Sequence, residues 1–527
     1  MVGYHPGVVP DHSGVMPDYS GVMPDHSGVM PNHSGVMPDH SGVMPDHSGV
    51  MPDHLRVVSH HLTVVGYHPP VFADHPARRR RPWGIPDVWP YISPKLTLPM
   101  RYAPIAPELF TENRRRFREL LPPGALAIFQ ANDVMPTNAD GHLAFRQNND
   151  LFYLSGVDQE DSILVIFPDA RLEKQREILF LKETSDLILV WEGYKLTKEQ
   201  AREVSGIPEI KWLASFETLL PALMNEAECV YLNTNEHIRA VVEVETRDAR
   251  FIKRLQAAYP LHDYRRAARL LHQLRAIKSP LEIALLRQAC AITEKAFRRV
   301  LNFVKPGVHE FEIEAEIIHE FLRNRSRGPA YGSIVASGKN ATILHYVSND
   351  EPCQDGDVIL LDFGAEYANY AADLSRSIPV NGRFTPRQRA VYEAVLAVMT
   401  YAKTLLVPGN EIEEYHKKVG ARMSDELIKL DLLTPEDVKN EDPDAPAYKK
   451  YFMHGTSHYL GLDVHDAGYK YRVFEPGMVY TVEPGIYIPA ENLGIRLEND
   501  ILLTATGNED LMANIPLQAD DIERLMR

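Results

Sequence analysis

Four carboxylates and one histidine in the last third of the chain each stand in or beside a distinctive apolar segment, and the fold must be able to gather them. These residues are Asp362, Asp373, His458, Glu483 and Glu498. Four carboxylates in one pocket would be costly, because like charges repel and burial disfavours the charged form. Two divalent cations would balance the four negative charges. The pattern therefore predicts a centre for two divalent metal ions.

The first two carboxylates lie close together in the sequence. Residues 358–361 form an apolar run of valine, isoleucine and leucine, which is typical of a buried strand, and Asp362 ends that run. Asp373 follows a short segment later. This spacing predicts a hairpin that returns Asp373 beside Asp362.

The other three residues lie in separate segments further along the chain. His458 closes the sequence His-Gly-Thr-Ser-His at residues 454–458. Glu483 follows Thr-Val and precedes Pro-Gly, and Glu498 follows Gly-Ile-Arg-Leu. Both glutamates therefore stand in or beside a β-type run.

In this order, the five segments resemble the metal-dependent pita-bread peptidases, a family that holds aminopeptidase P, prolidase and methionine aminopeptidase. They are most similar to bacterial aminopeptidase P, and the resemblance covers about residues 100–527. It implies an α/β (α+β) fold, in which a pita-bread catalytic domain at residues 269–527 follows a smaller α/β amino-terminal domain at residues 100–268. Strand-like runs at residues 126–129, 162–167 and 178–181, with helical or polar stretches such as residues 197–204 between and after them, support an α/β layer in that first domain.

The resemblance implies a role for each of the five residues. Asp362 and Asp373 would bind one metal ion, with Asp373 also reaching the second. His458 and Glu483 would complete the second, and Glu498 would bridge the pair. A hydroxide between the ions would attack the scissile carbonyl, and Glu483 would accept the proton. A donor set of oxygens with one imidazole suits Mn(II), which the family also favours, while Co(II), Fe(II) and Zn(II) stay open.

Further residues match segments that border the substrate in this family. Three histidines would assist catalysis, and four other side chains would contact the substrate or lie near it. The histidines are His345, His454 and His465; the others are Asp150, Trp191, Tyr487 and Arg496. Asp150 would hold the substrate ammonium, and Trp191 would offer an apolar wall.

The activity implied is release of the first residue from peptides with proline in second position. Prolidase, which cuts dipeptides only, is the alternative within the same fold, and methionine aminopeptidase normally lacks so large an amino-terminal domain. A binding protein that has lost catalysis is an alternative of a different class, and the presence of all five ligands argues against it. The family also implies a homo-oligomer, a dimer or a tetramer.

Composition limits the partners and the compartment. The net charge of −16 does not suggest a nucleic-acid partner, and no apolar stretch has the length of a membrane span. Three scattered cysteines, Cys229, Cys290 and Cys353, form no disulfide framework. With no secretory signal visible, we expect a cytoplasmic protein.

The first 99 residues differ from the rest. Residues 10–54 repeat the sequence Pro-Asp-His-Ser-Gly-Val-Met, whose proline and glycine exclude a coiled coil, so we expect disorder. Weak metal binding by its histidines is an alternative. The near-identical copies suggest a recent duplication, and we expect translation of the native protein to start at Met100.

Two helices and a loop are predicted in the second domain. Ser279-Pro280 with Glu282 forms a capping box that starts a helix, and Lys305-Pro306-Gly307 follows its end. A second helix is expected over residues 309–323. Residues 435–447, which are polar and contain three prolines, predict a loop before His454.

Overall fold

The computed structural model describes residues 101–469 and 471–527. The repeat predicted to be disordered and the expected start at Met100 both lie outside the described residues. Within the described part of the chain, no helix combines the length and the apolar character needed to cross a bilayer.

A six-stranded mixed sheet organises the amino-terminal domain. Its strands are β1 (Ala125–Gln130), β2 (Ile163–Ile166), β3 (Glu177–Leu181), β4 (Glu209–Trp212), β5 (Cys229–Leu232) and β6 (Asp263–Arg266). The order across the sheet is β4-β3-β2-β1-β5-β6. Strand β2 runs antiparallel to both of its neighbours, and the other pairs are parallel. The three strands and the helix predicted in this domain are confirmed.

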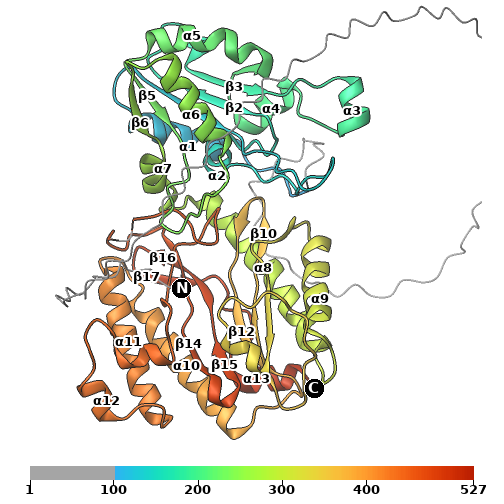
Figure 1. Cartoon of the computed structure of the whole chain (residues 1–527), viewed down its shortest axis with the longest axis vertical. Coiled ribbons are helices and arrows are strands. Elements are labelled where there is room, and N and C mark those ends of the chain that lie inside the picture. Colours follow the sequence, from blue (N-terminus) through green and yellow to red (C-terminus); the bar gives the residue numbers. More distant parts are fainter. Residues whose placement is uncertain (1–100, 470) are drawn as a thin grey trace, which may run out of the picture. The chain divides into compact units, whose positions relative to one another are not determined.

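Helices cover both faces of this sheet, because successive side chains of a strand point to opposite sides. Leu126 and Ile128 pack with α5 and α6, whereas Ala127 and Phe129 pack with α1, α2, α4 and α7. Figure 1 shows α5 and α6 against the sheet. The helices are α1 (Glu108–Glu119), α2 (Asn149–Ser155), α3 (Asp186–Glu192), α4 (Lys198–Ser205), α5 (Phe216–Glu226), α6 (Arg247–Ala258) and α7 (Ala268–Arg275).

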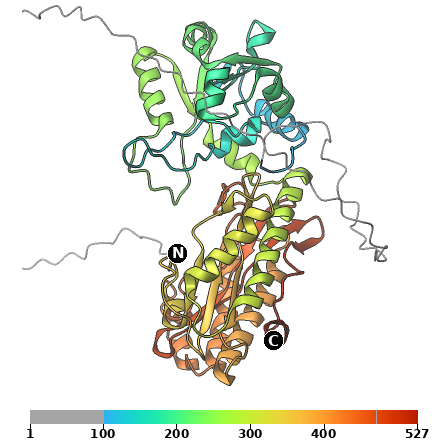
Figure 2. The same ribbon diagram turned by 90° about the vertical axis from the view of Figure 1, so that its right-hand side faces the viewer.

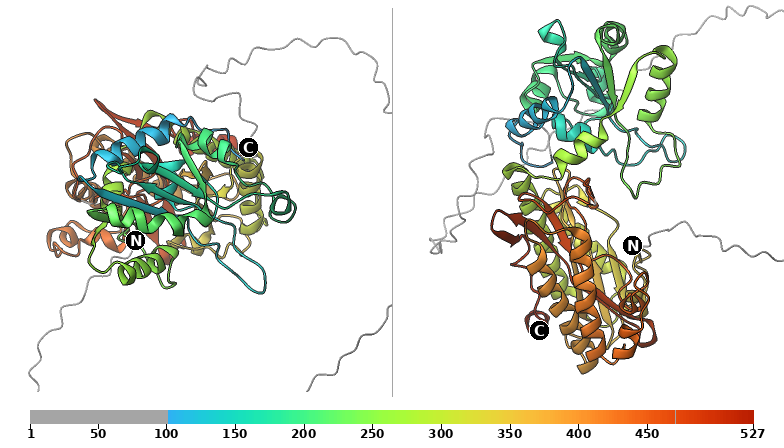
Figure 3. Two further views of the ribbon diagram at one scale, coloured as in Figure 1. Left: turned by 90° about the horizontal axis from the view of Figure 1, so that it is seen from above. Right: turned by 90° about the vertical axis from the view of Figure 1, so that its left-hand side faces the viewer.

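Long helices frame the second domain. They are α8 (Pro280–Phe303), α9 (Glu310–Arg323), α10 (Pro386–Leu405) and α11 (Ile412–Lys429), with the short α12 (Pro435–Lys439) and α13 (Ala519–Leu525). Helix α8 begins with the predicted capping box, and α9 matches the second predicted helix. The pairs α8–α9 and α10–α11 pack side by side (Figures 2 and 3).

Several small sheets of the second domain lie among these helices. Their strands are β7 (Gly328–Pro329), β8 (Ile334–Ser337), β9 (Val358–Asp362), β10 (Ala365–Tyr367), β11 (Tyr370–Ala371), β12 (Ser375–Pro379), β13 (Val479–Val482), β14 (Gly485–Ile488), β15 (Leu493–Arg496), β16 (Asn499–Thr504) and β17 (Gly507–Asp510). They form the groups β12-β9-β8, β13-β16-β17, β14-β15 and β11-β10-β7. One apolar core joins most of these strands to the helices α8 to α11.

The predicted loop at residues 435–447 is wrong in its first part. The Thr434 hydroxyl accepts a hydrogen bond from the Asp437 N–H, and the Asp437 carboxylate accepts one from the Thr434 N–H, so a capping box starts the short helix α12 there. Pro435 occupies the first helical position, where its missing N–H costs nothing. Prolines are typical of loops, but Pro435 begins a helix.

Candidate metal centre

A tight hairpin brings Asp362 and Asp373 together. Asp362 is the last residue of β9 and lies opposite Ser375 of the antiparallel β12, two residues beyond Asp373. The turn between them is the β10–β11 hairpin, which confirms the hairpin expected from the sequence. Only glycine fits at position 364, because a Cβ there would lie 1.7 Å from the Ala372 carbonyl oxygen. The glycine therefore lets the chain close and sets the two carboxylates side by side.

His458, Glu483 and Glu498 reach the same place from other strands. Glu483 directly follows β13, and Glu498 lies between β15 and β16. Ligand atoms of Asp373, His458 and Glu498 all lie within 4.8 Å of one another. The His458 Nε2 atom is 3.4 Å from Asp373 Oδ2 and 3.7 Å from Glu483 Oε1. All five candidate ligands predicted from the sequence therefore line one cavity of about 260 Å³.

The imidazole of His458 is held in one orientation. Its Nδ1 lies 2.9 Å from the Tyr459 carbonyl oxygen, and since a carbonyl only accepts, Nδ1 carries the proton. Nε2 is therefore the unprotonated nitrogen that faces the carboxylates. This is the arrangement in which a histidine can ligate a metal ion.

Burial and mutual repulsion disfavour the charged forms of three of the four carboxylates, Asp373, Glu483 and Glu498. Burial raises the pKa of Glu483 to about 7, and it raises the pKa of Asp373 and Glu498 well above the usual range, with neighbouring carboxylates adding to the effect. The Oε1 atoms of both glutamates are buried and have no hydrogen-bond partner among the described residues. Such orphaned oxygens fit a site that holds cations.

Further polar side chains fix the carboxylates in place, and no sequence motif indicates the first of them, Tyr331. The Tyr331 hydroxyl donates to Asp362 Oδ1 at 2.6 Å and also bonds Asp373. Arg496 Nη2 donates to Asp362 Oδ2 at 2.5 Å, and Ser375 donates to Glu498 Oε2 at 2.7 Å. Tyr331 is one tyrosine among 24 in a segment without a motif, so only the fold could identify it.

Tyr487, which was expected near the substrate, lies between two residues of the site. Its hydroxyl accepts from Arg496 Nη1 at 2.9 Å and lies 2.8 Å from His454 Nε2. Both Tyr487 and Arg496 therefore hold other side chains of the site in position. Their contact with a substrate stays a prediction.

The three supporting histidines all line the cavity of the five residues. The His465 ring lies edge-on to that of His458, with 4.4 Å between centroids. Burial lowers the pKa of His345, His454 and His465. At neutral pH they are therefore uncharged, and each can donate one hydrogen bond and accept another.

Asp150 and Trp191 lie elsewhere. The buried Asp150 carboxylate is bound by Arg275 Nη1 at 2.8 Å and by the Asn233 side chain at 2.9 Å. Trp191, at the end of α3, is 79% exposed. Within this chain the structure brings neither residue to the cluster, and their contacts with a substrate stay predictions.

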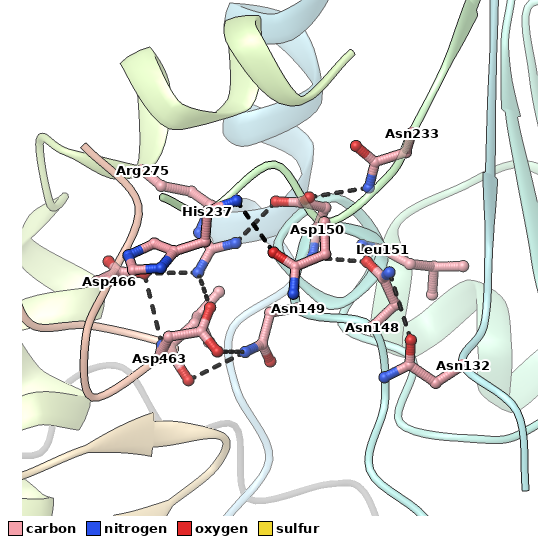
Figure 4. Close-up of polar contacts among 12 residues, drawn as sticks. Asn132, Asn148, Asn149, Asp150, Leu151, Asn233, His237, Arg275, Asp463 and Asp466 are labelled. Carbon is pink, nitrogen blue, oxygen red and sulfur yellow. Dashed lines mark hydrogen bonds and ion pairs between the residues drawn. The ribbon is translucent and has the colours of Figure 1, made fainter. Parts of the chain in front are cut away.

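Asp150 instead belongs to a buried ionic network between the two domains (Figure 4). Arg275 Nη2 binds Asp463 at 2.6 Å and Asp466 at 2.5 Å, and Lys278 binds Asp466 at 3.0 Å. Asp466 directly follows His465, so the network holds the loop that carries this histidine. The sequence shows Asp466 directly after His465, but an aspartate at such a position is equally typical of an ordinary turn.

Both domains of the chain match known protein families. Residues 284–505 match the model of metallopeptidase family M24, and residues 110–231 match that of the aminopeptidase P amino-terminal domain. The Xaa-Pro aminopeptidase of Haemophilus influenzae is 37% identical over 80% of this chain and 98% of its own length. The Xaa-Pro aminopeptidase of Escherichia coli is 36% identical over the same shares.

Solved structures agree with this assignment. Pseudomonas aeruginosa aminopeptidase PepP has a TM-score of 0.73 at 32% identity, covering 80% of this chain and 98% of that one. Zinc-substituted Escherichia coli aminopeptidase P in complex with product has a TM-score of 0.72 at 35% identity, covering 80% and 99%. The mixed α/β fold and the pita-bread domain expected from the sequence are thus confirmed. The chain belongs to metallopeptidase family M24, as a metal-dependent aminopeptidase with an aminopeptidase P amino-terminal domain.

Proposed function

We propose that this enzyme hydrolyses the peptide bond between an amino-terminal residue and a following proline. The observation that carries the proposal is the convergence of Asp362, Asp373, His458, Glu483 and Glu498 on one cavity. The relatives that match nearly their whole length are named Xaa-Pro aminopeptidases, which supports the proline specificity.

We assign two divalent metal ions to the five residues, most simply Mn(II). Asp362 and Asp373 would hold one ion, His458 and Glu483 the other, and Glu498 would bridge them. The oxygen-rich donor set with a single imidazole supports manganese. When bound, such a pair supplies an acidified water nucleophile and polarises the scissile carbonyl.

Side chains of the protein would transfer the proton and bind the substrate. Glu483, whose pKa burial raises to about 7, is poised to take a proton from the attacking water near neutral pH. His345 would deliver a proton to the leaving proline nitrogen or steady the tetrahedral intermediate. His465 would donate to the substrate carbonyl before the cut, and His454 would line the proline pocket.

Three further assignments extend the proposal. The domains are residues 1–99, 100–268 and 269–527, although α7, just beyond the second boundary, packs on the amino-terminal sheet. The enzyme is proposed to act in the cytoplasm on proline-containing peptides. It is proposed to form a homo-oligomer, a dimer or a tetramer, and the exposed α3 with Trp191 is available for such a contact.

The test is hydrolysis by the purified full chain after loading with Mn(II). The substrates are an Xaa-Pro tripeptide, an Xaa-Pro dipeptide and a Met-Ala tripeptide, with Glu483→Gln as the inactive reference. The proposal predicts cleavage of the Xaa-Pro tripeptide that chelation abolishes. Cleavage of the dipeptide alone would indicate a prolidase instead, and cleavage only of the Met-Ala peptide would contradict the proline specificity.

A further inference from the structure

A turn of the amino-terminal domain presents an arginine, Arg239, beside the candidate metal centre. The turn is fixed by its own hydrogen bonds: the Ala240 N–H donates to the His237 carbonyl oxygen at 2.8 Å, and the Arg239 N–H donates to His237 Nδ1 at 3.2 Å. The His237 N–H in turn donates to the Asn235 side chain at 3.1 Å. The backbone that carries Arg239 is therefore organised before any ligand binds.

Arg239 lines a cavity of about 430 Å³ that adjoins the metal centre. His465 is common to the walls of this cavity and of the cavity that holds the five candidate ligands. Burial lowers the pKa of Arg239, and the Glu483 carboxylate is close enough to act in the opposite direction. The guanidinium thus lines a cavity that shares a wall, at His465, with the cavity of the candidate metal centre.

The acidic side chains of this larger cavity already have cationic partners. Asp150 and Asp463 are bound by Arg275, as described above. Glu236 is bound by Arg266 at 2.8 Å, and Glu366 lies 3.6 Å from Arg327. Their negative charges are therefore largely balanced.

The arginines that remain have no such partner. Neither Arg239 nor Arg146, which also lines the cavity, forms an ion pair with any residue that the structure describes. Arg146 makes one long hydrogen bond, 3.4 Å, to the Ala330 carbonyl oxygen. The permanent positive charge of an arginine near two metal ions would repel the ions. An anionic ligand that binds the arginine would remove this repulsion.

We propose that Arg239 binds a carboxylate of the peptide substrate and so makes the enzyme prefer substrates that carry one near the cleavage site. This inference rests on the proposed function and adds the substrate class. A planar guanidinium matches a carboxylate through two parallel hydrogen bonds, which a lysine cannot reproduce. The carboxylate can be the carboxyl terminus of a short peptide or an acidic side chain.

The test compares four peptides with the Mn(II)-loaded full chain. They are Ala-Pro-Leu with a free carboxylate, its amide, and the amides of Asp-Pro-Leu and Ala-Pro-Asp. The variants are Arg239→Gln and Arg239→Lys. The matched control is Arg254→Gln, which removes an arginine that pairs with Glu217 on the surface of the same domain.

In the wild type, we expect kcat/KM for at least one carboxylate-bearing peptide to exceed that for the Ala-Pro-Leu amide by about tenfold or more. Arg239→Gln should remove this preference through KM, Arg239→Lys should restore part of it, and the control should keep it. A preference for free Ala-Pro-Leu identifies the carboxyl terminus, and a preference for either aspartyl amide identifies the side chain.

Equal losses on all four peptides, or no loss with Arg239→Gln, would overturn the inference while leaving the proposed function standing. If the wild type cleaves none of the peptides, the proposed function fails. Calorimetric binding of Pro-Leu and of its amide then tests Arg239 directly. Tighter binding of Pro-Leu that disappears with Arg239→Gln would support the inference, and equal binding of the two would refute it.

Discussion

Arg275 and Asp466 form a buried ion pair, with Nη2 2.5 Å from Oδ1, directly beside His465. Arg275 also binds Asp150 of the amino-terminal domain, so one guanidinium links that domain to the histidine loop. Its side chain is only 5% exposed, which keeps water from competing for these bonds. The amino-terminal domain therefore helps to set the position of a residue in the candidate active site.

Replacing Arg275 should destabilise the protein strongly. Arg275→Met would remove a cationic partner from Asp150, Asp463 and Asp466. Removing one member of a buried ion pair typically lowers the free energy of unfolding by about 3–5 kcal/mol. Urea unfolding measures the loss. The matched change Arg287→Gln, at an exposed pair with Glu509, should cost at most about 1 kcal/mol. Equal, small effects of the two changes would show that the network contributes little.

Tyr331→Phe should weaken metal binding while the fold is retained. The hydroxyl lies within hydrogen-bonding distance of both Asp362 and Asp373, and loss of a group that orients metal ligands typically lowers affinity by about 10–100-fold. Competition with a chelator of known affinity measures the change. Tyr264→Phe, which removes a hydroxyl bound to backbone carbonyls in the amino-terminal domain, is the control. Unaltered affinity in Tyr331→Phe would exclude this role.

The stability of the metal-free protein should fall as the pH rises through about 7. Burial raises the pKa of Glu483 from 4.5 to about 7, so the folded state binds this proton more tightly than the unfolded state does. The resulting stabilisation is complete below pH 4.5 and is lost as the pH rises through the folded pKa. Thermal unfolding between pH 5 and pH 8 measures it, with metal-loaded protein as the comparison. A metal-free Tm that climbs across this range would contradict the account.

Glu498→Gln should abolish activity without destabilising the metal-free protein. Burial and neighbouring carboxylates both disfavour the charged form of Glu498, so a neutral side chain of the same shape relieves repulsion. Turnover should nevertheless drop by several orders of magnitude, because a bridging ligand is lost. Asp362→Asn should lose activity similarly but also cost stability, since it weakens the bond to Arg496. Near-normal turnover in a folded Glu498→Gln variant would refute the assignment.

The sequence predicts those helices and strands that are marked by a local pattern of residues. The capping box at Ser279 predicted the start of α8, and the apolar run before Asp362 predicted β9. The five candidate ligands could be named because each lies in a recognisable segment. That the five side chains share one cavity could be predicted only from the resemblance to the family, because no local sequence pattern shows which strand ends lie close together.

Residues that act through long-range contacts escaped prediction. Tyr331 joins Asp362 and Asp373 across a sheet, and Arg275 meets Asp466 far along the chain. Arg239 stands on a turn without a motif, and only its place beside the cavity distinguishes it from a surface arginine. For Asp150 the sequence predicts a contact with the substrate ammonium, and no local pattern indicates the bond that its buried carboxylate makes with Arg275.

Anomalous diffraction from crystals of the Mn(II)-loaded full chain is the most direct test of the central assignment. The account predicts two peaks about 3.5–4 Å apart. They should be enclosed by Asp362, Asp373, His458, Glu483 and Glu498. Peaks that lie away from these five side chains, or no peak among them at full loading, would contradict it.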